Sequence, residues 1–125
     1  MERTEMPEIQ RIGESSRWSD VVIYRGEARW VEVAEDATLD VHGQIAQVLN
    51  QIDETLDLIG SNRACLLQVM IFLSDLQSAS ILNEQWDRWV PPEHPPIRAC
   101  VEAKLSPGYL VEMLISAAVR PTSGT

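Results

Sequence analysis

The feature that most constrains the fold is an eight-residue apolar run, Leu66–Leu73, which lies between two stretches with helical periodicity. Its length suits a strand, and an almost continuous apolar pattern is typical of a strand that is covered on both faces. The sequence therefore predicts a central strand at residues 66–73, in a sheet that is built from strand-helix-strand units.

Apolar residues recur at helical spacing on both sides of this run. Before it, one stripe comprises Val41, Ile45, Val48, Leu49, Ile52, Leu56 and Ile59. This stripe predicts a helix at about residues 39–59, ended by Gly60. After the run, a helix is predicted at about residues 78–89, and Pro91-Pro92 ends it. Its apolar side holds Ile81, Leu82, Trp86 and Trp89.

Two further pairs of strands complete the pattern. Residues 18–24 and 28–33 are predicted to form a β-hairpin around Arg25-Gly26-Glu27, whose glycine can adopt a positive φ. Residues 97–103 and 110–119 are predicted as strands joined by a turn at residues 106–108. The order strand-strand-helix-strand-helix-strand-strand indicates a mixed α/β fold with both helices on one face of the sheet.

Two helices on one side leave the other face of this sheet without cover. Met70, Phe72, Met113 and Ile115 cannot all be shielded by these helices, so we expect the second face to pack against another copy of the chain. The sequence therefore predicts a homo-oligomer.

Composition suits a single compact domain of 125 residues with 45% hydrophobic content. We assign residues 17–120 to this domain, residues 1–16 to a polar lead-in and residues 121–125 to a tail. The lead-in carries no apolar targeting segment and no stretch approaches the length of a membrane span, so a cytoplasmic protein without a membrane partner is expected.

Charge and cysteine usage narrow the possible partners. The formal net charge of −9 opposes binding to the phosphate backbone, which argues against nucleic acid as the main partner. His42 and His94 lie far apart and belong to no cluster with metal-ligand spacing, so no metal site is predicted. Cys65 and Cys100 are expected to be free thiols.

A second constraint comes from Pro95–Glu102, which is predicted as a strand that carries an arginine. Ile97, Ala99 and Val101 alternate with Arg98, Cys100 and Glu102, so the two sets lie on opposite faces. The guanidinium requires an anion. That anion is either an internal ion-pair partner, Glu102 on the same face, or the carboxylate of a ligand.

With these elements in place, the sequence resembles the RidA family, also called YjgF/YER057c/UK114, and is most similar to its YoaB-like branch. The resemblance covers residues 18–120. Its most specific motifs are Arg98-Ala99-Cys100-Val101-Glu102 after a proline-rich loop and Val111-Glu112 at the start of the last strand. Supporting motifs are Arg17-Trp18-Ser19-Asp20, Gly60-Ser61-Asn62, Phe72-Leu73-Ser74-Asp75, Asn83 and Trp86.

The resemblance implies a chorismate-mutase-like ββαβαββ fold that assembles as a homotrimer with ligand clefts between subunits. In active members, the arginine at the Arg98 position grips the carboxylate of a small imino acid such as 2-iminopropanoate or 2-iminobutanoate. Water then hydrolyses the imine to a keto acid and ammonia, which clears a reactive intermediate without a cofactor. The glutamate at the Glu112 position is implied to place or activate that water.

The resemblance assigns other residues to the cleft less specifically. Cys100 is expected to be an inert, buried thiol beside the ligand, because imine hydrolysis needs no covalent step. Trp18 could wall the cleft or pack in a core or interface. Asn83 could lie near the cleft or on the helix surface. Glu112 itself could point into one cleft with Arg98 or be a solvated edge carboxylate. The tryptophans at positions 30, 86 and 89 are assigned to packing.

Glu32 departs from the family pattern, because most members have a glycine at this position. A carboxylate there could repel an anionic imino acid, neutralise Arg98, or select a ligand that carries a second positive group. This residue supports an alternative function, a non-catalytic module that binds a small carboxylate or amine. An endoribonuclease activity, sometimes associated with the family, conflicts with the acidic composition.

Overall fold

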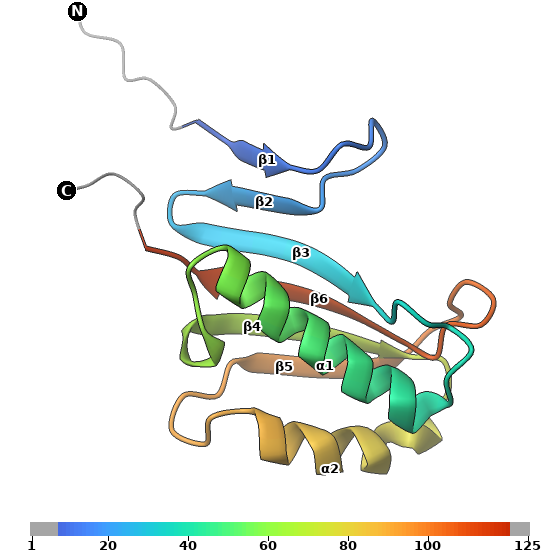
Figure 1. The fold of residues 1–125 in the computed structure, drawn as a ribbon. Helices are drawn as coiled ribbons and strands as arrows, with labels where there is room; N and C mark the ends of the chain where they lie inside the picture. The colour runs from blue at the N-terminus through green and yellow to red at the C-terminus, as the bar shows by residue number, and fades with distance from the viewer. Residues whose placement is uncertain (1–7, 121–125) are drawn as a thin grey trace, which may run out of the picture.

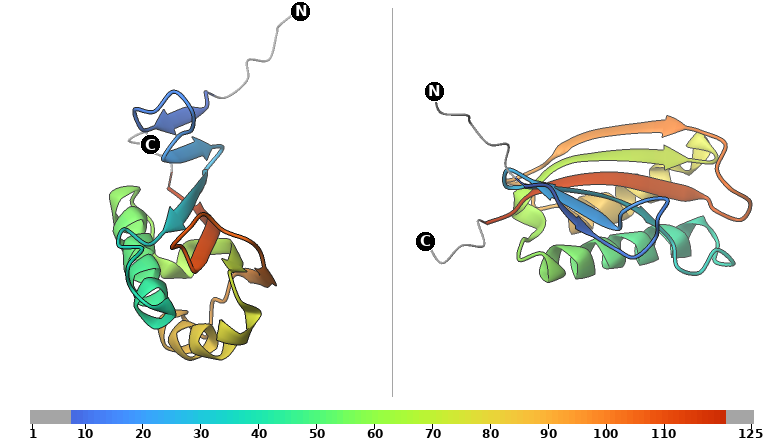
Figure 2. Two further views of the ribbon diagram at one scale, coloured as in Figure 1. Left: turned by 90° about the vertical axis from the view of Figure 1, so that its right-hand side faces the viewer. Right: turned by 90° about the horizontal axis from the view of Figure 1, so that it is seen from above.

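A computed structural model of the chain describes residues 8–120, which form one six-stranded sheet with two helices packed on one of its faces (Figures 1 and 2). The strands are β1 (Gln10–Ile12), β2 (Val21–Tyr24), β3 (Glu27–Val33), β4 (Leu66–Leu73), β5 (Ile97–Glu102) and β6 (Val111–Ala118). The helices are α1 (Val41–Leu58) and α2 (Ala79–Trp89), with short 3-10 turns at Arg63–Cys65 and Leu76–Ser78. The sheet order is β1-β2-β3-β6-β4-β5.

The predicted elements are confirmed, apart from small differences at their ends. Asp40 caps α1 by accepting a hydrogen bond from the backbone N–H of Gly43 at 2.8 Å, and Gly60 follows its C-terminus with φ of 75°. Arg25 and Gly26 both have positive φ, which is the two-residue turn that best matches the twist of a β-hairpin. The turn therefore joins β2 to β3 as predicted.

Strand β1 was not predicted, and it lies in the segment that we assigned to a polar lead-in. Its three residues pair antiparallel with β2, and only Ile12 is partly buried against the core. One inward residue gives no detectable periodicity, which explains the missing prediction. The predicted tail, residues 121–125, lies outside the described residues, as do the first seven residues of the lead-in.

The position of β4 differs from the prediction in two respects. It lies fifth in the sheet order, between β6 and β5, rather than at the centre. Only one of its faces is covered, because Val69, Ile71 and Leu73 are buried beneath the helices while Gln68 on the other face is exposed. The apolar run therefore marks a strand with one face in the core and the other face free for a partner.

The predicted pairing of the last two strands is wrong. Among residues 8–120, β5 pairs only with β4, in parallel, whereas β6 pairs antiparallel with both β3 and β4. The loop from Ala103 to Leu110 carries the chain past β4, where its ends hydrogen-bond to Leu73 and Ser74. β5 is therefore an edge strand, paired on one side only.

The core fills the space between the sheet and the helices. Helix α1 contributes the predicted stripe, with Ile45, Val48, Leu49, Ile52 and Leu56 buried. Met113 and Ile115 of β6 are also buried here, so their predicted placement on the bare face is wrong. One buried polar residue, Gln44, donates to the carbonyls of Ala37, Leu39 and Gly108 and accepts from the N–H of Leu110.

The opposite face of the sheet is open and largely apolar, as the uneven placement of the helices predicts. Val31 is 52% exposed, Leu114 46%, Ile97 69% and Val101 39%, and register places them on the face that bears Met70 and Phe72. An apolar surface that extends over four strands is typical of a protein interface.

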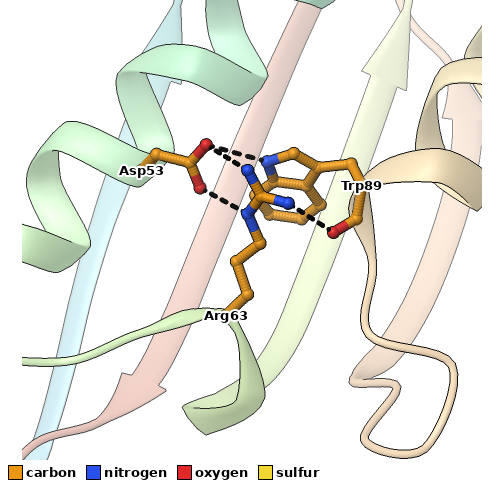
Figure 3. Close-up of polar contacts among 3 residues, drawn as sticks. All are labelled: Asp53, Arg63 and Trp89. Atoms are coloured by element: carbon orange, nitrogen blue, oxygen red, sulfur yellow. Dashed lines mark hydrogen bonds and ion pairs between the residues drawn. The ribbon is translucent and has the colours of Figure 1, made fainter.

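A polar network fastens the end of α2 to α1 (Figure 3). The guanidinium of Arg63 donates through Nε and Nη2 to the two carboxylate oxygens of Asp53, at 2.8 and 2.7 Å. Its Nη1 donates to the carbonyl of Trp89 at 3.0 Å, and the indole Nε1–H of Trp89 donates to Asp53 at 3.3 Å. Three of the five N–H donors of this guanidinium thus have protein partners.

Candidate functional site

Arg98 lies on the exposed edge strand β5, and its side chain faces the helix layer. Register aligns it with the buried Val69 of β4. Its guanidinium carbon lies 5.4 Å from the centre of the Trp86 ring on α2, which is a cation–π contact. Among residues 8–120, no carboxylate lies within ion-pair distance of Arg98.

Glu102, which we considered as an internal partner of Arg98, makes a different contact. It accepts a hydrogen bond from the backbone N–H of Leu76 at 2.9 Å and so helps to hold the turn before α2. The structure therefore contains no Arg98–Glu102 ion pair within its described part. The guanidinium is left available for an anion from outside this chain.

Two predicted residues accompany Arg98 on this side of the sheet. Cys100 follows on the same face of β5, is half-buried and has a free thiol. Burial raises the pKa of this thiol, although the nearby Arg98 charge opposes the shift, so the group is a poor nucleophile. Asn83 is exposed on α2, one helical turn before Trp86.

A second set of predicted residues lines a cavity of about 780 Å³ beside β3. Strand β2 reaches only residues 27–29 of β3, so within the described residues the second half of β3 has no strand on that side. The cavity opens there and is lined by Ile12, Trp18, Ser19, Asp20, Val21, Trp30, Val31, Glu32, Val33, Thr55, Leu58 and Glu112. Trp18, with 64% of its surface exposed, forms part of this wall rather than of the core.

Three neutral donors hold the carboxylate of Glu32 in this cavity. The indole Nε1–H of Trp30 and the hydroxyl of Thr55 donate to Oε1, at 3.2 and 3.0 Å. The side-chain amide of Gln51 donates to Oε2 at 2.9 Å and also to the carbonyl of Val33 at 2.8 Å. Trp30, which we assigned to packing alone, thus also has a polar role.

Gln51 and Thr55 were missed in the sequence analysis. They lie four residues apart on α1, where polar side chains next to an apolar stripe are usually solvated. The signal that identifies them is their pairing with a charged residue, Glu32, on an inward-facing strand position.

The structure does not bring all the predicted site residues together within one chain. Glu112 lies opposite Phe72, on the open face, whereas Arg98 lies opposite Val69, on the helix face. Strand β4 also separates β5 from β6. The prediction that Arg98 and Glu112 meet through a β5–β6 pair is therefore wrong, and Glu32 does not neutralise Arg98 of its own chain.

Residues 8–120 contain no group of three histidine, cysteine or acidic side chains arranged to hold a metal ion. Within the same range, neither helix is long and apolar enough to cross a membrane.

Comparisons with known proteins agree with this architecture. A profile of the family described as Endoribonuclease L-PSP matches residues 10–119. The chain is 42% identical over 112 residues to the RutC family protein YoaB of Escherichia coli, a match that covers 89% of this chain and 98% of that one.

Solved structures show the same fold. A putative translation initiation inhibitor from Salmonella typhimurium is 43% identical, with a TM-score of 0.82 over 89% of this chain and 97% of the other. A YjgF family protein from Neisseria meningitidis is 35% identical, with a TM-score of 0.86 over 94% and 100%. The sequence motifs, the sheet topology and these matches together establish that the chain belongs to the Endoribonuclease L-PSP family, which is the YjgF or RidA family.

Proposed function

We propose that this protein is an imine deaminase that hydrolyses small 2-imino acids to 2-keto acids and ammonia. The observation that carries the proposal is the guanidinium of Arg98, which rests on Trp86 without a carboxylate partner among residues 8–120. A planar guanidinium offers two parallel donors to a carboxylate and so fixes the orientation of an imino acid.

The reaction needs one proton-transfer group besides this anchor. Water adds to the imine carbon, the carbon–oxygen bond forms, and the double bond to nitrogen becomes a single bond. Breaking that bond releases ammonia and leaves the ketone. Glu112 is proposed to carry both protons of the water to the nitrogen, the first as the carbon–oxygen bond forms and the second from the resulting hydroxyl as the carbon–nitrogen bond breaks. Its half-buried carboxylate lines the cavity beside β3, where a bound substrate and a water molecule have room.

The site is proposed to be shared between neighbouring chains of a homotrimer. Arg98 belongs to one edge of the sheet, whereas Glu112 and Trp18 belong to the cavity at the open part of β3. A closed ring of chains joins two different surfaces of each copy. If the apolar open faces turn inward, the β5 edge of one chain meets the β3 cavity of the next, and the two half-sites combine.

Two observations bear on competing functions. A formal net charge of −9 opposes the phosphate contacts that ribonucleases and other nucleic-acid-binding proteins need, which disfavours the ribonuclease activity in the family's description. A non-catalytic binding module remains the second candidate, because Glu32 adds a fixed charge to the cavity that imine hydrolysis itself does not require.

The proposal is tested by ammonia release from 2-iminopropanoate and 2-iminobutanoate, generated in the assay from their parent amino acids by an amino-acid oxidase. Wild-type protein should accelerate release, and Arg98→Ala should abolish the acceleration. Arg88→Ala is the matched control, because Arg88 is an exposed arginine of α2 whose one ion-pair partner in the described part of the chain is Glu84. Light scattering should give three times the 14.1 kDa mass of one chain. Binding of the keto acids without faster ammonia release would favour the binding module.

A further inference from the structure

We propose that Glu32 is a specificity-determining residue, and that the substrates of this protein are 2-imino acids whose side chain ends in an ammonium or guanidinium group. This inference rests on the proposed function and names its substrate class. It follows from how the carboxylate of Glu32 is held, from the charges around it and from the aromatic wall of the same cavity.

The hydrogen bonds of Glu32 fix the position of its carboxylate and leave one acceptor position unoccupied. A carboxylate accepts about four hydrogen bonds, two at each oxygen. Oε1 accepts from Trp30 and Thr55, whereas Oε2 accepts only from Gln51 among residues 8–120. One acceptor position therefore remains on Oε2, and the side chain is half-buried rather than fully enclosed.

The charge of Glu32 is not compensated by these contacts. All three donors are neutral groups, and within the described part of the chain no arginine or lysine lies within ion-pair distance of Glu32. The cavity is lined by twelve residues, among which Asp20 and Glu112 are also acidic and none is basic. A positive group on the ligand would supply the missing counter-charge at short range.

The aromatic wall favours the same ligand class. Trp18 is largely exposed and lines the cavity together with Trp30. The face of an indole ring attracts ammonium and guanidinium groups more strongly than neutral groups of similar size. The substrate is thus bound at both of its charged ends. Arg98 of a neighbouring chain binds the carboxylate of the imino acid, and Glu32 binds the positive group at the end of its side chain.

The test compares two ligands of the same shape that differ in charge. The 2-keto acids that correspond to arginine and citrulline are suitable, because one ends in a guanidinium and the other in a neutral urea. Titration calorimetry on the full-length wild-type protein should show about tenfold tighter binding of the guanidinium ligand. In Glu32→Gln, which keeps the side-chain shape, the ratio of the two affinities should fall several-fold, and only the weaker attraction of Asp20, Glu112 and the indole rings remains.

The matched control is Glu35→Gln, because Glu35 is an exposed acidic residue two positions beyond β3 that does not line the cavity. This variant should keep the tenfold preference. A second variant, Thr55→Val, removes one donor to Oε1 without changing side-chain volume and should lower the preference only in part. Equal affinities in wild type, or an unchanged preference in Glu32→Gln, would overturn the inference.

Binding and turnover separate this inference from the proposed function. If the guanidinium ligand binds preferentially but neither imine is hydrolysed, the specificity of Glu32 stands and the deaminase proposal fails. If 2-iminopropanoate is hydrolysed while the two larger ligands bind equally, the deaminase proposal stands and the role of Glu32 is rejected.

Discussion

Arg63 and Arg98 occupy similar positions over two tryptophans of α2, yet only Arg63 has a carboxylate partner in the described chain. The guanidinium carbon lies 5.1 Å from the ring centre of Trp89 in one case and 5.4 Å from that of Trp86 in the other. Arg63 additionally makes a bidentate ion pair with Asp53 (Figure 3). The hydrogen bonds to Asp53 raise the pKa of Arg63.

The difference between these arginines indicates what Arg98 lacks. Both tryptophans are buried and lie 5.5 Å apart between ring centres, so they form one aromatic platform. Arg63 contacts this platform in a partly solvated position beside α1, where Asp53 supplies the anion. Arg98 contacts the platform from an edge strand, where its exposed guanidinium has no carboxylate partner among residues 8–120 and a ligand carboxylate would complete the same arrangement. The contact between Arg63 and Asp53 therefore shows the geometry that we expect when Arg98 binds a ligand carboxylate.

The largest expected effect comes from Arg98→Ala. Removing the anchor should weaken binding of 2-oxobutanoate, measured by titration calorimetry, by about 2–5 kcal/mol if the contact is desolvated in the assembled site. The free energy of unfolding should fall by less than about 1 kcal/mol, because the side chain is exposed and loses only a solvated cation–π contact with Trp86. Equal affinity in wild type and variant would make Arg98 a merely structural residue.

Arg63→Ala should instead lower the stability of the fold and leave ligand binding unchanged. The substitution leaves Asp53 and the carbonyl of Trp89 without their donor. We expect a loss of about 1–2 kcal/mol in the free energy of unfolding, at the lower end for charged hydrogen bonds because the pair is partly solvated. Urea denaturation measures this loss. Affinity for 2-oxobutanoate should stay near the wild-type value, and a large drop would show that the two arginines are not independent.

Arg98→Lys tests the comparison with Arg63 more closely, because it keeps the positive charge and removes the planar guanidinium group. Lysine can make a single contact to a carboxylate and stacks less well on Trp86, so binding should weaken by about 1 kcal/mol. The same titration decides this. Wild-type affinity in the variant would show that only the charge of Arg98 matters, and that the likeness to the Arg63–Asp53 geometry has no functional meaning.

The smallest expected effect concerns Cys100. Burial raises its pKa above the ordinary value of 9.0, so the folded protein holds this proton more tightly than the unfolded chain does. The resulting stability is present below pH 9.0 and is lost as the pH rises through the pKa of the folded state. Cys100→Ala should therefore reduce the fall in urea midpoint between pH 8 and pH 10, and should leave ligand binding unchanged.

The elements with long apolar patterns were predictable from the sequence. The α1 stripe and the β4 run each bury one continuous set of side chains, and their observed ends lie within two residues of those predicted. Strand pairing was less predictable. The turn after residue 103 suggested a β5–β6 hairpin, whereas the helix between β4 and β5 makes these two strands parallel neighbours and sends β6 to their other side.

The candidate site was predictable as a set of residues but not as an arrangement. Motifs identified Arg98, Glu112 and Trp18, and alternation placed Arg98 opposite the apolar residues of its own strand. The contacts of Glu32 with Gln51 and Thr55 depend on how α1 lies beneath β3, which no local pattern encodes. Likewise, only the observed register shows that Arg98 and Glu112 face opposite sides of the sheet.

The most direct test of a site shared between chains is complementation between Arg98→Ala and Glu112→Gln. Each variant alone should release ammonia from 2-iminopropanoate at no more than about a hundredth of the wild-type rate. When the two are co-expressed, random assembly should restore about a quarter of wild-type activity, because one interface in four then pairs an intact Arg98 with an intact Glu112. Activity no higher than that of the separate variants would contradict the shared site.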